Sequence, residues 1–509
     1  MASTNFSNNV FQSHITQGGR NTGDSKARGA LGPLPDIASL GDRSLISRAV
    51  IRGTARVCEC LLLAALGFAI GYAYVPDQVM TLASPYVFAL FATALATGLI
   101  FDALKLYSVS ALSGIVRSLP ALMLGWTVAI GILMATVFFL KLGPEVSRVW
   151  LGAWFIGGAL LILSVRAAFS VQVRRWIRAG RLEKRAVIYG AGQSATDLRR
   201  ALEQDADSSV RIVGTFDDAD AGIGADGETM PGGLDDLVAL ARRVRIDVVI
   251  LNLPMTAETR LTSVLAALYQ LPVAIRMPAS TSPIRFRPRT YSYYGSVPFI
   301  DLSDPPISDW GLVAKWLFDK SIAAAALVLL APLMLAVAAA IKLGSKGPVL
   351  FRQKRYGFNN ELIEIYKFRS MYQDRADANA AKLVTRDDPR VTPIGRFIRK
   401  TSIDELPQLF NVLKSDISLV GPRPHALQAK AADRLYDEVV EEYFARHKVK
   451  PGITGWAQIN GWRGETDTQE KIARRVEHDL YYVENWSIFL DLYILMKTPF
   501  ALFDTRSAY

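Results

Sequence analysis

The sequence contains only two cysteines, Cys58 and Cys60, and both lie inside one apolar run. Two cysteines in 509 residues cannot build a disulfide framework, and a C-x-C pair alone is a poor metal site. The histidines His425, His447 and His478 show no spacing typical of metal ligands, so we interpret them as structural residues or residues at the edge of a substrate site. The composition therefore argues against a disulfide-rich secreted protein and a His/Cys metal centre.

A cleavable signal peptide is also missing, because the first 45 residues are polar and rich in Ser, Asn, Gly and Arg. We expect this tail to be disordered. The rest is unusually apolar, since hydrophobic residues make up 50% of the chain. The net charge of +11 would suit nucleic acid or an anionic membrane surface, and the apolar runs favour the membrane. We therefore expect a lipid bilayer, and no nucleic acid, as the partner.

Four apolar runs of about 20 residues can each cross a bilayer as a helix. They lie near residues 54–76, 83–101, 119–140 and 149–170. An even number of spans returns the chain to its starting side, and both flanks are rich in arginine, which the positive-inside rule places in the cytoplasm. The sequence therefore predicts four transmembrane helices within residues 46–172, with both ends of this segment in the cytoplasm and with links such as Pro76-Asp77-Gln78 between the helices.

Residues 173–280 alternate between strand and helix patterns, which indicates a Rossmann-like α/β domain. The turn Gly190-Ala191-Gly192 follows a buried strand at 186–189, and Asp217-Asp218 ends a second strand at 210–216. A helix near 234–243 and a strand at 246–251 continue the pattern. Either the turn binds a dinucleotide at the helix N-terminus, or it is kept only for packing. The sequence leaves both interpretations open.

Residues 281–312 contain several prolines and a basic-aromatic stretch, and we interpret them as an ordered linker. The fifth apolar run, 321–341, is long enough to span a bilayer, but Pro332 lies near its middle. Proline removes a backbone hydrogen bond and kinks a helix. Because basic residues flank both ends, we expect a re-entrant helix that enters, turns at Pro332 and leaves on the same side.

The polar C-terminal part, 313–509, carries two adjacent carboxylates, Asp404 and Glu405, close to clustered cations. One carboxylate can attack phosphorus or hold Mg²⁺, while Arg and Lys neutralise phosphate oxygens. Alternatively, Ser402 and Glu405 form a capping box that opens a helix at 403–413. The cations are Arg352, Lys354, Arg355, Lys367, Arg369, Arg390, Arg396, Arg399 and Lys400, with Arg423 in the loop Gly421–Pro424.

Six segments in one order make residues 313–509 resemble the catalytic domain of the polyprenyl-phosphate hexose-1-phosphate transferases, the monotopic phosphoglycosyl transferases. The four spans and the Rossmann-like domain look like the N-terminal half of the large members. The segments are K-W-L-F-D (315–319), G-P-V-L-F-R-Q (347–353), Y-K-F-R-S-M (366–371), G-R-F-I-R-K-T-S-I-D-E-L-P-Q (395–408), S-L-V-G-P-R-P-H (418–425) and R-H-K-V-K-P-G-I-T-G-W-A-Q-I-N-G (446–461).

The resemblance implies that Asp404 attacks the β-phosphate of a UDP-sugar and that Glu405 assists by holding Mg²⁺ or positioning the acceptor. Asp404 and Glu405 would thus be the metal ligands. Arg399 matches the family's phosphate-binding arginine. Further phosphate-binding candidates are Lys367, Arg369, Arg423 and Arg396. At the kink the family commonly carries Ser-Pro, whereas this chain has Ala331-Pro332 and so lacks a hydroxyl that could satisfy freed carbonyls.

The resemblance therefore implies a membrane protein with three parts: a four-helix transmembrane bundle, a Rossmann-like α/β domain, and a mixed α/β monotopic catalytic domain on the cytoplasmic face. The segments 462–468, 485–487 and 490–491 look like the branch that uses UDP-glucose and undecaprenyl phosphate to start exopolysaccharide repeat units. The alternatives are another UDP-hexose (galactose or an N-acetylated sugar), a dead lipid-binding scaffold, and a membrane-tethered sugar-nucleotide dehydratase. The resemblance also implies a homodimer.

Overall fold

Four long apolar helices form the first part of the chain. In this computed structural model they are α1 (Arg48–Tyr74), α3 (Pro85–Ala103), α5 (Ile115–Phe139) and α6 (Arg148–Arg178), with the short α4 (Val109–Ser113) before α5. The structure describes residues 46–76, 84–205, 210–218, 232–254, 257–279, 291–373, 388–425, 430–431, 434–436, 440, 443–464 and 468–503. The expected tail and the link residues Asp77 and Gln78 lie outside this set.

Three of these helices begin at a serine that caps them, whereas α5 begins after Gly114 without a side-chain cap. Ser47, Ser84 and Ser147 accept hydrogen bonds from backbone N–H groups in the first turns of α1, α3 and α6. Helix α1 packs on α3 and α6, and α5 packs on α3 and α6. Inside, Arg166 donates to Glu59 at 2.9 Å and to the Leu106 carbonyl at 2.6 Å, so a buried ion pair joins α1 to α6.

The strands that follow α6 form an open α/β sheet, and this part of the chain is called the Rossmann-like domain below. Its strands β1 (Lys184–Tyr189), β2 (Val210–Phe216), β3 (Val248–Leu251) and β4 (Ala274–Pro278) are parallel in the order β2-β1-β3-β4. The helices α7 (Gln193–Gln204), α8 (Leu234–Arg243) and α9 (Glu258–Leu268) accompany the strands. Buried Val, Ile and Leu side chains on both faces of the strands form the domain core, as expected for a doubly covered parallel sheet.

The interpretation of 281–312 as a linker is wrong for residues 291–303. Strands β5 (Tyr291–Tyr294) and β6 (Val297–Ser303) form an antiparallel hairpin, and β6 pairs with β4 at the edge of the sheet. The physical reason is that Tyr294 and Phe299 are buried against the sheet, while Gly295, at a φ of 62°, allows the tight turn. The basic residues before this hairpin lie outside the described residues.

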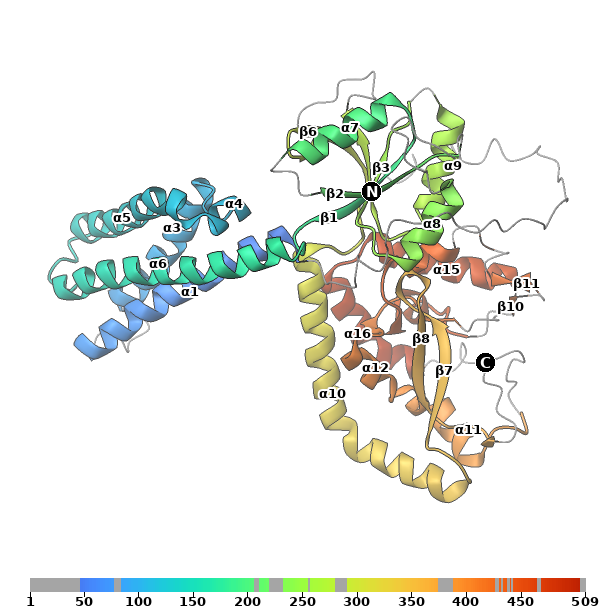
Figure 1. Cartoon of the computed structure of the whole chain (residues 1–509). Helices are drawn as coiled ribbons and strands as arrows, with labels where there is room; N and C mark the ends of the chain where they lie inside the picture. Colours follow the sequence, from blue (N-terminus) through green and yellow to red (C-terminus); the bar gives the residue numbers. More distant parts are fainter. Residues whose placement is uncertain are drawn as a thin grey trace, which may run out of the picture.

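Helix α10 (Asp309–Gly344) contains the fifth apolar run and continues through Pro332. Figure 1 shows that it bends about halfway along its length and lies beside the C-terminal part of the chain. Before the proline, Ala323 packs with Val412 and Leu419; after it, Met334, Val337 and Ile341 pack with Phe368 and Ile398. By length and composition, α10 is one of five described helices able to cross a membrane.

The C-terminal part is a mixed α/β unit that packs along α10. It contains the hairpin β7 (Leu350–Tyr356) and β8 (Leu362–Phe368), and the parallel pair β9 (Ser418–Val420) and β12 (Gly452–Thr454). Helical elements join them. These are η4 (Phe358–Asn360), α11 (Pro393–Lys400), η6 (Ile403–Glu405), α12 (Gln408–Lys414), η7 (Tyr443–Lys448), α14 (Trp456–Ile459), α15 (Gln469–Glu484) and α16 (Ile488–Phe503), beside the two-residue strands β10 (Lys430–Ala431) and β11 (Arg434–Leu435).

The Rossmann-like domain rests on this unit through polar and aromatic contacts. Tyr269, at the end of α9, donates to Glu484 of α15 at 2.8 Å, and the Lys448 ammonium lies 3.4 Å from the Tyr269 ring centroid. Asn359 also donates to the Ala241 carbonyl of α8. Helices α8 and α9 therefore face η4, η7 and α15, as Figure 1 shows for α15.

Candidate active site

Asp404 and Glu405 lie on η6, a single 3-10 turn between α11 and α12. The capping-box interpretation of Ser402 and Glu405 is wrong. Ser402 has a φ of 58°, whereas an N-cap residue needs an extended backbone, and its side chain makes no cap hydrogen bond. The expected helix at 403–413 is therefore split, and α12 starts only at Gln408, after Pro407.

The Glu405 carboxylate faces two cations instead. Lys367 Nζ donates to Glu405 Oε1 at 2.8 Å, and Arg423 donates to both carboxylate oxygens, with the Nη1–Oε2 distance 3.2 Å. Burial alone would raise the pKa of Glu405, but Arg423 and Lys367 hold this pKa well below its usual range. Glu405 is therefore ionised and fixes the two cations beside Asp404.

The carboxylate of Asp404 forms no hydrogen bond or ion pair with any residue that the structure describes. Burial raises the pKa of Asp404 to about 6, although the charge of Lys367 opposes this shift. Near neutral pH the carboxylate is thus mainly ionised while no protein donor occupies its oxygens. A carboxylate of this kind, next to cations, can act as a nucleophile toward phosphorus.

The loop that carries Arg423 is held by close backbone packing. The N–H of Gly421 donates to the Thr454 carbonyl at 2.9 Å, and the N–H of Gly452 donates to the Pro422 carbonyl at 2.9 Å. A Cβ atom on Gly421 would come within 2.4 Å of the Lys450 carbonyl oxygen. The loop Gly421–Pro424 and the chain around Gly452 therefore form one closely packed unit behind Arg423.

Not all of the expected phosphate-binding residues lie at the Asp404–Glu405 dyad. Lys367 and Arg423 contact Glu405, and the charge of Arg399 acts on Asp404. Arg396 is exposed on α11, and no described contact joins it to the dyad. Arg369 donates to the Ser345 and Lys346 carbonyls instead, so it holds the C-terminal end of α10.

Two further arginines reach the site. Arg355 lines a small cleft with Lys367, Glu405 and Arg423, and burial, followed by the charge of Arg423, lowers its pKa to about 10. In the β7–β8 register, Arg355 pairs with Ile363, so it lies on the same face as Lys367. Because side chains alternate along a strand, Arg355 lies on the opposite face of β7 from Arg352 and Lys354. This alternation could have been used to single out Arg355 from the sequence.

Arg463 is the second addition. It donates to Ser402 Oγ, and its charge acts on Glu405 and Asp404. Its position in the chain gave no signal for this contact, because 61 residues separate it from Ser402. With Arg355, Lys367, Arg399 and Arg423, five cations surround two carboxylates. The excess positive charge suits a ligand with more than one phosphate.

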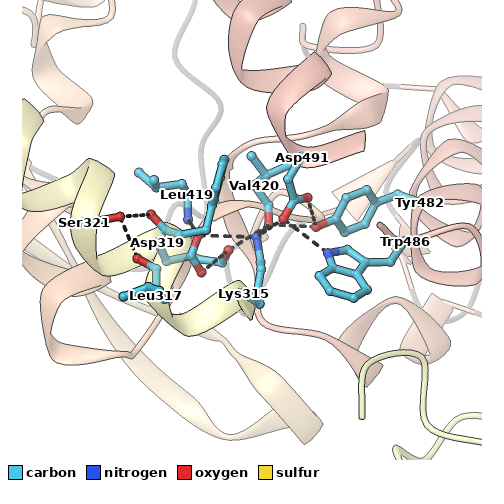
Figure 2. Close-up of polar contacts among 11 residues, drawn as sticks. Lys315, Leu317, Asp319, Ser321, Leu419, Val420, Tyr482, Trp486 and Asp491 are labelled. Atoms are coloured by element: carbon cyan, nitrogen blue, oxygen red, sulfur yellow. Dashed lines mark hydrogen bonds and ion pairs between the residues drawn. The ribbon is translucent and has the colours of Figure 1, made fainter. Parts of the chain in front are cut away.

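A second polar network anchors α10 (Figure 2). Lys315 Nζ donates to Asp491 Oδ2 at 2.7 Å and to the Val420 carbonyl at 3.0 Å, and it lies 3.3 Å from Asp319 Oδ1. Tyr482 also donates to Asp491 and to the Val420 carbonyl. Since Val420 lies three residues before Arg423, this network fixes both the start of α10 and the loop that carries Arg423.

The glycine turn of the Rossmann-like domain is held by the acids that follow β2. Asp217 accepts a hydrogen bond from the Ala191 N–H at 2.6 Å and pairs with Arg260, while Asp218 accepts from Tyr189 and from the Leu234 N–H. These contacts occupy the carboxylates that would otherwise bind the ribose of a dinucleotide. They favour the interpretation in which the turn is kept for packing.

His425, His447 and His478 each contact other residues of the protein. His425 contacts Arg446 and Tyr443, His447 contacts Asn360, and the His478 ring donates to the Arg474 carbonyl. No group of three or more His, Cys, Asp or Glu side chains among the described residues could hold a metal ion.

The Asp404 carboxylate, which has no partner among the described residues, lies among half-buried cations and beside a kinked apolar helix. This arrangement is typical of a membrane-associated enzyme class that acts on phosphorylated substrates. A family model described as bacterial sugar transferase matches residues 310–505, and a model for a CoA-binding domain matches residues 102–279. The chain belongs to the bacterial sugar transferases, the polyprenyl-phosphate hexose-1-phosphate transferase family.

The relatives are similar to this chain over stretches of different length. The undecaprenyl-phosphate glucose phosphotransferase of Komagataeibacter xylinus is 45% identical over 65% of this chain, which spans 61% of that relative's length. The UDP-glucose:undecaprenyl-phosphate glucose-1-phosphate transferase of Xanthomonas campestris pv. campestris is 32% identical over 84% of this chain and 89% of its own length. An Aeromonas hydrophila UDP-N-acetylgalactosamine-undecaprenyl-phosphate N-acetylgalactosaminephosphotransferase is 48% identical over 35% of this chain and 41% of its own.

Proposed function

We propose that the protein transfers glucose-1-phosphate from UDP-glucose to undecaprenyl phosphate, giving undecaprenyl-diphosphate-glucose and UMP. This reaction starts an exopolysaccharide repeat unit. The observation that carries the proposal is the Asp404 carboxylate, which has no partner among the described residues although Lys367, Arg423, Arg355 and Arg463 surround the dyad. The names of the Komagataeibacter and Xanthomonas relatives support glucose as the sugar.

The proposed reaction has two steps. An oxygen of Asp404 attacks the β-phosphorus, the bond from that phosphorus to the bridging oxygen breaks, and UMP leaves with the electron pair. The sugar phosphate is then held as an acyl phosphate. A phosphate oxygen of undecaprenyl phosphate attacks the same phosphorus, and the bond to Asp404 breaks, which restores the carboxylate. Covalent catalysis separates a donor that arrives from water from an acceptor that arrives from the bilayer.

The residues around the dyad perform the charge stabilisation in both steps. Lys367 and Arg423, fixed by Glu405, neutralise phosphate oxygens as charge moves toward the leaving UMP. We also propose a requirement for Mg²⁺, which needs few protein ligands because it takes phosphate oxygens and water, and which would further neutralise the donor diphosphate. The open oxygens of Asp404 fit this role, whereas those of Glu405 are engaged with Lys367 and Arg423.

For the membrane arrangement we propose α1, α3, α5 and α6 as the transmembrane bundle and α10 as a re-entrant helix. Both halves of α10 pack on the same C-terminal unit, and this supports re-entry, because a spanning helix would be expected to carry its two ends to opposite sides of the membrane. Its other face is apolar and exposed, with Val328 and Leu329 each 79% exposed. Basic residues at both flanks support the cytoplasmic side for the active site. The homodimer is carried over from the resemblance alone, and the mass of the purified protein tests it.

The test is UMP release by the purified chain in nanodiscs with undecaprenyl phosphate, Mg²⁺ and a panel of UDP-sugars. We expect release with UDP-glucose. Release only with UDP-N-acetylgalactosamine, the donor in the Aeromonas relative's name, or with UDP-galactose would keep the reaction and replace the donor. No release from any donor by folded protein would contradict the reaction and favour a lipid-binding scaffold.

A further inference from the structure

A buried carboxylate that does not touch the dyad lies behind the active site. Asp479 of α15 is 2% exposed and forms an ion pair with Arg446 at 2.6 Å. Its charge also acts on Arg475, which lies one helical turn earlier and is 5% exposed. Burial raises the pKa of Asp479, and the charges of Arg446 and Arg475 oppose that shift. Asp479 is thus the direct counter-ion of Arg446 and a nearby negative charge for Arg475, to which no described hydrogen bond or ion pair joins it.

The first of these arginines holds the backbone of Arg423. Arg446 Nη2 donates both to Asp479 Oδ2 and, at 2.7 Å, to the carbonyl oxygen of Arg423 itself. Its Nη1 lies 2.6 Å from His425 Nδ1, two residues further along the same loop. The guanidinium of Arg423 meanwhile extends to Glu405. Arg446 therefore fixes the point from which the Arg423 side chain reaches the dyad.

The second arginine holds the backbone on both sides of Arg463. Arg475 Nε donates to the Trp462 carbonyl at 2.8 Å, and Nη2 donates to the Gly464 carbonyl at 2.5 Å. The residue between them, Arg463, donates to Ser402 Oγ, two residues before Asp404. Arg475 therefore fixes Arg463 in the same way that Arg446 fixes Arg423.

We propose that Asp479 is a positioning residue that, through Arg446 and Arg475, holds Arg423 and Arg463 at the donor diphosphate. This inference rests on the proposed function. Burying two arginines and a carboxylate is costly, and apolar residues of similar volume would often stabilise a core as well. A positioning role would explain why this cost is tolerated, because each arginine binds the main chain beside a residue whose side chain reaches the dyad.

The expected effect is on donor use. Asp479→Asn keeps an oxygen for Arg446 but removes the charge that acts on Arg446 and Arg475, so the two loops shift. A displacement of about 1 Å at a reacting group can cost roughly 100-fold, and we expect a loss of this size in kcat/KM for UDP-glucose. The KM for undecaprenyl phosphate should change less than the KM for UDP-glucose, because we place the arginines that Asp479 positions at the donor diphosphate.

The experiment measures UMP release by full-length variants in nanodiscs, with thermal unfolding midpoints recorded for each. Asp479→Asn should lower kcat/KM about 100-fold in the wild-type background but less than about threefold in an Arg423→Lys/Arg463→Lys background. Asp479→Glu, which keeps the charge, should recover most of the loss. Glu477→Gln, on the exposed side of the same helix, is the matched control and should behave as wild type.

Wild-type kcat/KM in Asp479→Asn, or losses that multiply with those of the arginine variants, would overturn the inference, because a general loss of structure multiplies in every background. If Asp479→Asn does not fold, Arg446→Lys replaces it, since lysine keeps the charge but lacks the fork that joins Asp479 to the Arg423 carbonyl. Arg446→Lys should then show the same non-additivity with Arg423→Lys, and multiplying losses would overturn the inference. A wild-type chain that releases no UMP would overturn the proposed function and this inference together.

Discussion

Lys367 Nζ donates to Glu405 Oε1 at 2.8 Å, and this contact divides the roles of two carboxylates that are adjacent in the sequence. Arg423 binds the same carboxylate, so Glu405 acts as the counter-ion that aims both cations. Asp404 has no such partner among the described residues. The dyad therefore combines one fixed and one available carboxylate.

This division predicts different outcomes for two isosteric changes. Asp404→Asn removes the attacking oxygen's charge and should lower UMP release by on the order of 10³-fold or more, whereas Glu405→Gln only loosens Lys367 and Arg423 and should cost roughly 10²-fold. Initial rates and intact-protein mass measure this, since only Asp404 can carry a trapped sugar phosphate. Membrane flotation is the control for insertion. Asp404→Asn within tenfold of wild type would refute the nucleophile assignment.

The network around Lys315 should dominate the stability of the C-terminal unit. Lys315→Met leaves Asp491 and Asp319 buried without their shared cation, and breaking a buried pair in this way costs about 3–5 kcal/mol. Thermal unfolding in nanodiscs should therefore shift strongly downward. The exposed pair Arg352–Glu364 is the control, and Arg352→Met should cost less than about 1 kcal/mol. Equal shifts for the two variants would contradict the anchoring role.

The re-entrant arrangement predicts which side of the membrane each surface faces. In a background with both native cysteines replaced by serine, an impermeant maleimide added to intact cells should label Glu145→Cys, in the loop between α5 and α6. It should label Lys354→Cys on β7 only after permeabilisation. Both positions are exposed in the protein, so accessibility depends on topology alone. Labelling of Lys354→Cys in intact cells would show that α10 crosses the membrane.

Much of this organisation could be predicted because it depends on local patterns. The βαβ rhythm, the kink at Pro332 and the clustering of Lys367 and Arg423 near the dyad follow from periodicity, proline chemistry and charge. The hairpin 291–303 was missed because its strands are short and follow a proline-containing stretch that is typical of a linker. Tertiary pairing with β4, which no local pattern encodes, decided its structure.

The wrong predictions at the site also result from contacts between residues that are far apart in the sequence. Ser402 fits the capping-box pattern, yet its hydroxyl accepts a hydrogen bond from Arg463. The Glu405 carboxylate likewise accepts hydrogen bonds from Lys367 and Arg423 and not from the backbone N–H that a capping box requires. Arg369 is two residues from Lys367, so strand alternation would place both side chains on one face. Strand β8 ends at Phe368, however, and Arg369 contacts the end of α10 rather than the dyad. Charge-assisted contacts between distant segments outweighed the local propensity in each case.

His425 provides a pH test of the loop that carries Arg423. Burial, and then the charges of Arg446, Arg475 and Arg355, hold the pKa of His425 well below its usual range, and Tyr443 and Tyr436 enclose the ring. Above about pH 6.5 the ring is neutral in both the folded and the unfolded chain, so it does not affect stability. Below that pH the unfolded chain takes up a proton that the folded chain refuses, which favours unfolding by about 1.4 kcal/mol per pH unit.

Unfolding midpoints measured from pH 7.5 to 5.5 should therefore fall as the pH falls, with His447 adding to the slope because burial and Arg446 also hold its pKa low. Asp404 opposes part of this slope, because burial raises its pKa to about 6 and the folded chain takes up that proton first. His425→Gln keeps an acceptor for Arg446 but cannot titrate, so this variant should show a shallower slope than wild type. An unchanged slope would mean that His425 is protonated in the folded protein. Its Nδ1 could then not accept from Arg446, and the Arg423 loop would be held without this contact, by the bond from Arg446 to the Arg423 carbonyl and by the Gly421–Gly452 packing.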